Sequence, residues 1–165
     1  MVAMSQIDIE NKNANIDVFR LWKLLDHTKF MIGRLREMEL ARFGLTPEQV
    51  HVMDIISQNG GTTTINEIVE LTMRQHHSIS TLINRMTRQE LVNKIKTTDD
   101  KRIFKVVITE KGQTLLRKVS RDSIINTFIS LTEEEKIDLD TNLRKLLIKA
   151  YDLLGKEYKL HFPLK

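Results

Sequence analysis

Apolar residues recur at helical spacing over much of the chain. One long helix over residues 18–43, ending near Gly44, is indicated by Phe19, Trp22, Leu25, Ile32, Leu35 and Met38. The run Thr46-Pro47-Glu48-Gln49 has the pattern of a capping box and predicts a second helix. Val52, Ile55 and Ile56 give that helix an apolar face, and Gly60-Gly61 ends it.

Two short helices follow in close succession. Thr64-Ile65-Asn66-Glu67 is a second capping box and predicts a helix to about Thr72. After a few polar residues, helical periodicity resumes over 76–89. Two short helices joined by a brief turn are typical of a helix-turn-helix.

A β-hairpin is predicted next. Two short β-like runs, 91–97 and 103–108, flank a polar and charged tip at 98–102. Thr109-Glu110-Lys111-Gly112 then begins a helix that carries Leu115, Leu116, Val119, Ile124, Ile125 and Phe128. A third capping box, Thr132-Glu133-Glu134-Glu135, opens a last helix with Ile137, Leu139, Leu143, Leu146, Leu147, Ala150, Leu153 and Leu154. The predicted fold is mainly α with a small β-hairpin wing.

The ends of the chain carry more apolar surface than the middle can cover. We expect an N-terminal helix at 1–45, a winged helix-turn-helix domain at 46–112, and C-terminal helices with a tail at 113–165. The tail adds Tyr158, Leu160, Phe162 and Leu164. We predict that both ends form the dimerisation region of a homodimer; the alternative is that the two ends pack on each other within one chain.

The helix over 76–89 has two different faces. Ile79, Leu82, Ile83 and Met86 fall at i, i+3, i+4 and i+7 and predict a buried face. The outer face presents short hydrogen-bonding groups and guanidinium groups: Arg74, His77, Ser78, Thr81, Asn84, Arg85 and Arg88. Neither Glu nor Lys, the usual residues of a solvent face, occurs between Arg74 and Gln89. We therefore predict a recognition helix for the major groove of duplex DNA rather than an ordinary solvent face.

The hairpin tip is basic. Asp100 and Arg102 lie two residues apart, so in an extended strand they point to the same side and the carboxylate can orient the guanidinium. An oriented arginine suits the narrow minor groove, and Lys101 and Lys105 would add phosphate contacts. The alternative is a surface ion pair without a role in function.

Charge and composition narrow the class of protein. The chain has 165 residues and a net charge of +4, and residues 71–105 alone hold eight Lys or Arg and three acids, a balance of 8 − 3 = +5. Such clustering is the footprint of a nucleic-acid binder. There is no cysteine, which excludes disulfides, thiolate zinc sites and cysteine redox sensors. With no apolar run of membrane-spanning length and no apolar signal core in Met1–Asn15, we expect a cytoplasmic protein without membrane contact.

An enzyme is the first alternative. Adjacent His76 and His77 point about 100° apart on a helix and do not form the i, i+4 pair that chelates a metal. The sequence also has no phosphate-binding glycine loop and no nucleophile elbow, so we predict no catalytic residue, no metal and no cofactor. The second alternative is a winged-helix module that binds protein, which would need an apolar recognition face.

Two motifs resemble the MarR family of winged-helix transcriptional regulators. One is Gly44-Leu45-Thr46-Pro47-Glu48-Gln49, at the start of the second helix. The other is Asp100-Lys101-Arg102 followed by Val106-Val107-Ile108-Thr109-Glu110-Lys111-Gly112, similar to the family's wing. The order of elements agrees from Val18 to about Leu154, while Glu90 replaces a glycine found in many members.

The resemblance implies a homodimer with interlocking terminal helices that binds a pseudo-palindromic operator and usually represses transcription. It gives Arg102 the role of the wing arginine and Asp100 that of its partner. Many members release DNA when a small aromatic or phenolic anion binds between the dimer region and the winged domain. We place that effector pocket at Trp22, His27, Phe30 and His51; the alternative is that these are core or core-edge residues. Peroxide sensing through cysteine is excluded.

Overall fold

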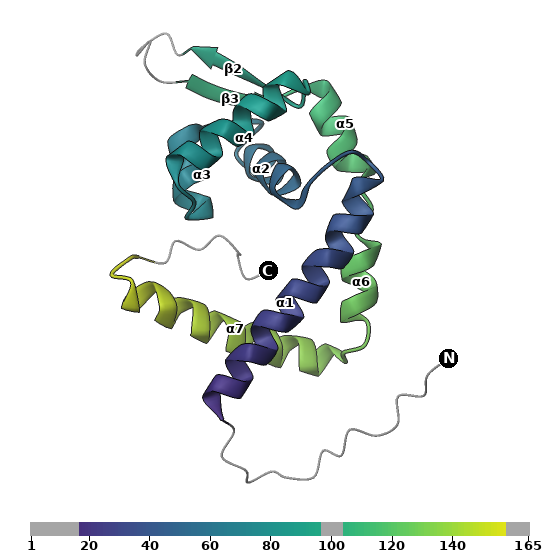
Figure 1. Cartoon of the computed structure of the whole chain (residues 1–165), viewed down its shortest axis with the longest axis vertical. Coiled ribbons are helices and arrows are strands. Elements are labelled where there is room, and N and C mark those ends of the chain that lie inside the picture. Colours follow the sequence, from purple (N-terminus) through teal and green to yellow (C-terminus); the bar gives the residue numbers. More distant parts are fainter. Residues whose placement is uncertain (1–16, 97–103, 158–165) are drawn as a thin grey trace.

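The computed structural model describes residues 17–96 and 104–157. Its elements, in chain order, are α1 (Val18–Ala41), α2 (Pro47–Gln58), β1 (Thr62–Thr64), α3 (Ile65–Thr72), α4 (His76–Arg88), β2 (Val92–Lys96), β3 (Phe104–Ile108), α5 (Glu110–Lys118), α6 (Asp122–Phe128) and α7 (Glu133–Leu153). Figure 1 shows α2, α3, α4 and the hairpin grouped at one end, with α1, α6 and α7 at the other. The prediction of a mainly helical fold with a small β-hairpin wing is confirmed.

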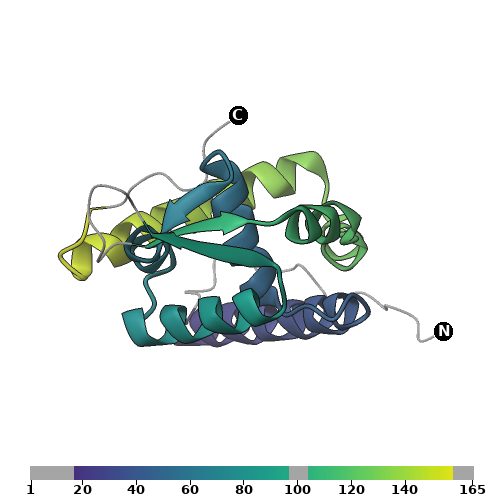
Figure 2. The ribbon, with the colours of Figure 1, turned by 90° about the horizontal axis from the view of Figure 1, so that it is seen from above.

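One small antiparallel sheet closes the winged part. The strand order is β1-β3-β2, with Thr63 opposite Val106 and Asn93 opposite Val107. Figure 2 shows the strands lying beside one another. The buried apolar core runs from Leu40 to Ile108 and draws on α1, α2, α3, α4, β2 and β3. Its burial is what fixes α4 against the rest of the domain.

The helix starts follow from local hydrogen bonding. Thr46, Thr64 and Thr132 each accept a bond from the N3 backbone N–H, and the N3 side chain bonds back to the cap. These reciprocal bonds satisfy backbone donors that would otherwise be orphaned. All three predicted capping boxes are confirmed. The first helix ends at Ala41, before the predicted limit at 43, and the chain turns at Gly44 with φ +69°.

Two details of the predicted elements are wrong. Thr62–Thr64 forms a short strand, β1, that the pattern did not indicate, because it is held by pairing with distant β3. The helix that begins after Thr109 does not continue to Phe128. It breaks at Val119, whose ψ of 117° is extended, and α6 starts at Asp122.

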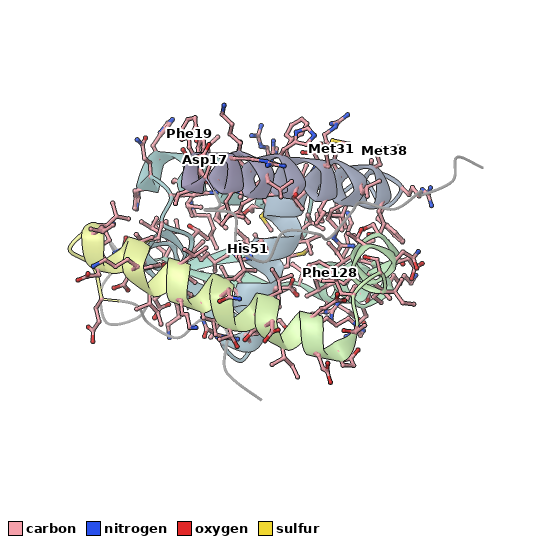
Figure 3. The ribbon with its side chains drawn as sticks, turned by 90° about the horizontal axis from the view of Figure 1, so that it is seen from below. Asp17, Phe19, Met31, Met38, His51 and Phe128 are labelled. Carbon is pink, nitrogen blue, oxygen red and sulfur yellow. The ribbon has the colours of Figure 1, made fainter. Side chains whose placement is uncertain are left out.

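The terminal helices expose most of their apolar side chains. Of their own residues α1 buries only Glu39 and Leu40, and α7 buries none. Figure 3 places Phe19, Met31 and Met38 along α1, where each is at least half exposed. α6 packs beside α1, but the described residues do not bury α1 and α7 against each other. Within those residues no helix is long and apolar enough to cross a membrane.

Candidate nucleic-acid interface

The helix α4 has one buried and one exposed face. Ile79, Leu82, Ile83 and Met86 are all buried, as the periodicity predicted. The seven candidate contact residues are all exposed: Arg74, His77, Ser78, Thr81, Asn84, Arg85 and Arg88. The structure therefore gathers these side chains on one open surface, where polar groups on a rigid helix can meet a flat or grooved partner.

Arg74 stands just before α4 rather than on it. Its guanidinium lies 3.5 Å from the Glu48 carboxylate of α2, and both side chains are about half exposed. The pKa of Glu48 is lowered, first by a hydrogen bond from its own backbone N–H and further by Thr46 and Arg74. An exposed pair of this length contributes little to stability, so the guanidinium can exchange its partner for a phosphate.

The turn before α4 has an unusual backbone. Met73 caps α3 in the left-handed region, at φ 56° and ψ 22°. At the other end of α3, Glu67 completes its capping box, and its pKa is lowered mainly by the Thr63 hydroxyl and the Thr64 N–H. Since α3 packs on α4, both ends of the shorter helix help to set the direction of the longer one.

The wing brings a further cation to α4. Lys94 on β2 donates to Asn84 Oδ1 at 3.0 Å, and its ammonium lies 5.1 Å from the centre of the Phe104 ring. Lys105 on β3 is exposed and lies close enough to Glu67 to favour its ionised form. The wing-tip candidates Asp100, Lys101 and Arg102 lie outside the described residues.

Lys94 was not among the predicted contact residues. The only sign of it in the sequence is its membership of the basic run over 71–105. Its place beside Asn84 depends on how β2 returns along α4, which no local pattern specifies.

The base of the wing is tightly built. Glu90 adopts φ 60°, and the Leu91 N–H donates to Met86 O at 2.9 Å while the Glu90 N–H donates to Thr87 O at 3.0 Å. This is a Schellman ending of α4, a position that usually prefers glycine. Thr109 Oγ1 donates to Glu90 O at 2.6 Å, which ties the start of α5 to the end of α4.

The predicted effector residues come from two helices, three from α1 and one from α2. Trp22 stacks on Phe19 at 5.4 Å and His27 on Phe30 at 6.5 Å, both pairs on the exposed surface of α1. His51 on α2 lines a cavity of about 190 Å³ together with Val52, Ile79 and Leu82.

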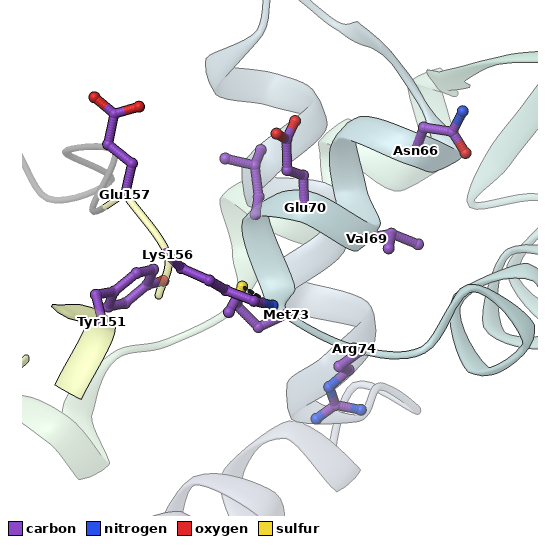
Figure 4. Close-up of a pocket in the computed structure, with 9 residues that line it drawn as sticks. Asn66, Val69, Glu70, Met73, Arg74, Tyr151, Lys156 and Glu157 are labelled. Carbon is purple, nitrogen blue, oxygen red and sulfur yellow. Dashed lines mark hydrogen bonds between the residues drawn. The ribbon is translucent and has the colours of Figure 1, made fainter. Parts of the chain in front are cut away.

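A larger cavity lies elsewhere. It has a volume of about 690 Å³ and is lined by the end of α3, the turn before α4 and the end of α7. Figure 4 shows Lys156 reaching across it to Met73, with the ammonium 3.7 Å from the thioether sulfur. Among residues 17–96 and 104–157, no group of three or more metal-ligating side chains occurs.

Comparison with known proteins agrees with this geometry. Residues 43–103 match the sequence pattern of the MarR family. The chain is 27% identical over 130 residues to YsmB of Bacillus subtilis, an uncharacterised HTH-type transcriptional regulator, covering 75% of this chain and 86% of that protein. It is 26% identical over 128 residues to the HTH-type transcriptional regulator MhqR of the same organism, covering 76% and 88%.

Solved structures extend the likeness in fold to nearly the whole chain. The organohalide-sensing regulator RdhR, in its 2,4-dichlorophenol-bound form, has a TM-score of 0.81 at 24% identity and covers 97% of this chain and 98% of that one. A C80S variant of MarR from E. coli, complexed with operator DNA, has a TM-score of 0.72 at 22% identity and covers 79% and 99%. These relatives are transcriptional regulators, which confirms the prediction that the protein is not an enzyme. The matched segment spans the helix-turn-helix and the first wing strand, and the likeness in fold extends beyond it. The predicted resemblance to the MarR family is confirmed.

Proposed function

We propose that the protein is a sequence-specific DNA-binding transcriptional regulator. The observation that carries this proposal is the exposed face of α4, where hydroxyl, amide and guanidinium groups stand opposite a fully buried apolar face. Hydroxyl and amide groups can read base edges in the major groove, and arginine can bind guanine or phosphate. A MarR relative complexed with operator DNA and two HTH-type regulators among the relatives support this function.

The wing completes the proposed contact. Arg102 enters the minor groove with Asp100 as its orienting partner, while Lys101 and Lys105 bind phosphates. Lys94 adds a cation between the wing and α4, beside Asn84. Together these groups account for much of the positive charge of residues 71–105.

The working unit is a homodimer on a pseudo-palindromic operator. Residues 1–45 and 113–165 supply its dimerisation region, and residues 46–112 its DNA-binding domain. The support is the apolar surface of α1 and α7, which the single chain leaves open: Phe19, Trp22, Leu24, Phe30, Leu146 and Leu153 are all more than half exposed. A protein of this kind works in the cytoplasm and represses its target genes until a ligand releases it.

The ligand is a small aromatic or phenolic anion. RdhR, a relative in fold, was solved with 2,4-dichlorophenol bound. For this chain the proposed pocket is formed by Trp22, His27, Phe30 and His51. Trp22, His27 and Phe30 lie on the exposed surface of α1 in the single chain, so in this proposal the second protomer completes the pocket.

An electrophoretic shift assay tests the function. The probe is duplex DNA from upstream of the protein's own gene, with unrelated DNA of equal length as competitor. Thr81→Ala and Arg85→Ala should each weaken specific binding by roughly 1–3 kcal/mol if the residue makes a base contact. Arg117→Ala removes an exposed arginine from α5, away from α4, and controls for net charge.

The shift assay has one result that supports the proposed function and one that rejects it. Loss of specific binding in both α4 variants, with Arg117→Ala unchanged, supports the proposal. In the same assay Arg102→Ala should reduce the salt dependence of binding by about one unit, since one cation fewer displaces counterions from the DNA. Equal affinity of the wild-type protein for upstream and unrelated DNA would reject sequence-specific binding.

A further inference from the structure

Two chain connections join the winged part to the terminal helices. The first is the end of α1, where Leu40 is already fully buried in the core. The second is the break between α5 and α6, where residues 119–121 leave the helical conformation. Any rotation of the winged part against the terminal helices must bend both connections.

One buried ion pair links the two connections. Arg36 Nη1 on α1 lies 2.5 Å from Glu39 Oε2, and the same nitrogen donates to the backbone oxygen of Ser120 in the break, also at 2.5 Å. Glu39 Oε1 accepts from the Ser123 N–H at 3.1 Å, and its other oxygen accepts from the Ser123 hydroxyl. We call this set of four residues (Arg36, Glu39, Ser120 and Ser123) the joint.

The joint holds its charges away from water. Glu39 is 8% exposed, and the Arg36 side chain is 15% exposed. Burial by itself would raise the pKa of Glu39, but hydrogen bonds from Ser123 and Arg36 outweigh it and lower the pKa to about 2. Asp54 on α2 faces the same region: burial raises its pKa, and the charges of Arg121, His51 and Arg36 act in the opposite direction.

A neighbouring pair on α1 shows what is special about the joint. Arg34 and Glu37 have the same i, i+3 spacing and a 2.6 Å contact, but their side chains are 58% and 48% exposed. A buried ion pair is a poor source of net stability compared with apolar residues, yet its geometry is strict because each charge needs its partners in place. The joint is therefore better suited to fixing the angle between the winged part and the terminal helices than to stabilising the fold.

We propose that Arg36 and Glu39 are positioning residues that fix the winged domain relative to the terminal helices and so set the half-site spacing that the dimer accepts. The inference rests on the proposed function as a dimeric DNA-binding regulator. The two recognition helices of such a dimer must enter grooves about one helical turn apart, roughly 34–36 Å. One extra base pair moves a half-site by about 3.4 Å and rotates it by about 35°. A rigid joint rejects that change, whereas a loosened joint tolerates it.

The test compares matched double variants. Arg36→Met with Glu39→Gln removes the ion pair without leaving a lone buried charge, and the amide oxygen introduced by the second substitution can still accept from the Ser123 N–H. Arg34→Met with Glu37→Gln makes the same chemical change on the exposed pair. The probes are the upstream operator, with half-sites mapped by footprinting, and two versions with one central base pair added or removed.

The expected result is a change in discrimination rather than in affinity alone. Wild-type protein and the exposed-pair variant should bind the altered operators at least tenfold more weakly than the original, and the joint variant less than threefold more weakly. A second readout needs no DNA. Because the chain has no cysteine, Gln58→Cys at the exposed end of α2 gives one spin-label site per protomer. The distance distribution between the two labels should be narrow in wild-type protein and broad in the joint variant.

Each remaining outcome is decisive. If the joint variant keeps the wild-type ratio between operators and the same distance distribution, the joint has only a structural role and the inference is overturned. If it does not fold, Ser123→Ala, which removes one hydrogen bond to Glu39, takes its place with the same expected direction and the same overturning result. Failure of the proposed function looks different, since the wild-type protein would then bind no operator specifically or would show no label-to-label distance.

Discussion

At the scale of single residues, Gly112 is required by a close backbone approach. A Cβ at this position would lie 2.3 Å from Leu91 O and 3.0 Å from Ile108 Cγ1. The Leu91 oxygen cannot move away freely, because it accepts from the Thr109 N–H and the Thr109 hydroxyl, each at 3.1 Å. The glycine of the sequence motif therefore serves packing between α5 and the base of the wing.

Gly112→Ala should destabilise the protein by about 1–3 kcal/mol, the usual cost of forcing an extra group into a packed site. Urea unfolding at fixed protein concentration measures it. Gln113→Ala, the exposed neighbour on the same helix, is the control and should change stability by less than about 0.5 kcal/mol. Equal stability of the two variants would show that the close approach relaxes without cost.

At Glu90, in contrast to Gly112, we expect a substitution to stabilise the protein. It occupies a left-handed position at φ 60°, which costs a residue with a Cβ about 1–2 kcal/mol. Its ion pair with Lys111, at 3.0 Å and largely exposed, contributes little to stability. Glu90→Gly should therefore raise stability by about 1 kcal/mol in thermal unfolding, while Glu90→Gln, which keeps the Cβ, should not. A less stable glycine variant would mean that the Lys111 contact outweighs the backbone strain.

At the scale of elements, the contact between α1 and α6 should depend on pH through Glu39. The pKa of this carboxyl is lowered from 4.5 to about 2 in the folded protein. Between these two pKa values, the Glu39 carboxyl is protonated in the unfolded chain but stays ionised in the folded protein. The stability from this group is fully present above pH 4.5 and is lost as the pH falls towards 2.

Glu39→Gln isolates this effect. At pH 7 it should cost about 3 kcal/mol, because it leaves Arg36 without its buried partner, and the gap from wild type should narrow between about pH 4.5 and 2. The raised pKa of Asp54 changes stability with pH in the opposite direction. Because Asp54 is present in both proteins, its effect cancels in the stability difference between wild type and Glu39→Gln. Unfolding curves at about pH 7, 4 and 3 measure the gap, with exposed Glu37→Gln as control. A gap independent of pH would contradict the assignment to Glu39.

The element boundaries show where sequence patterns suffice. The starts of α2, α3 and α7 could be predicted because each capping box is made by residues within one turn. The break at Val119 could not, because the apolar spacing continues through it to Phe128. What ends α5 is tertiary: Val119 packs against the core, and Arg36 binds the Ser120 carbonyl from another helix.

At the scale of the whole molecule, the open apolar surface of the terminal helices should hold two protomers together. Leu146 on α7 is 56% exposed in the single chain, and Ile95 on the wing is 52% exposed. Leu146→Lys should weaken the dimer at least tenfold in sedimentation equilibrium, because a charge would have to be buried in the interface. Ile95→Lys makes the same change outside the proposed dimerisation region and should leave the association constant unaltered. Equal effects of the two substitutions would reject the proposed interface.

The two faces of α4 follow from local sequence. Ile79, Leu82, Ile83 and Met86 are spaced so that a helix must bury them together, and the polar residues between them are then turned outward. The same local logic predicted the wing strands, since β-branched residues on either side of a polar tip favour a hairpin. These are properties of neighbouring residues, and they carried the likeness to MarR proteins as well.

Contacts between distant segments depend instead on the folded chain. Thr62–Thr64 forms a strand through pairing with β3, and Lys94 reaches Asn84 because β2 returns along α4. The effector residues proposed from the sequence were assigned to one pocket, yet Trp22 and Phe30 stand on open surface in the single chain.

The two ion pairs of α1 show the physical reason. In the sequence, Arg36 and Glu39 are an ordinary i, i+3 pair, the same as Arg34 and Glu37. Only the approach of Ser120 and Ser123, more than eighty residues away along the chain, turns one of these pairs into a buried joint. Spacing along a helix sets which side chains can meet, but burial depends on which distant segment covers them.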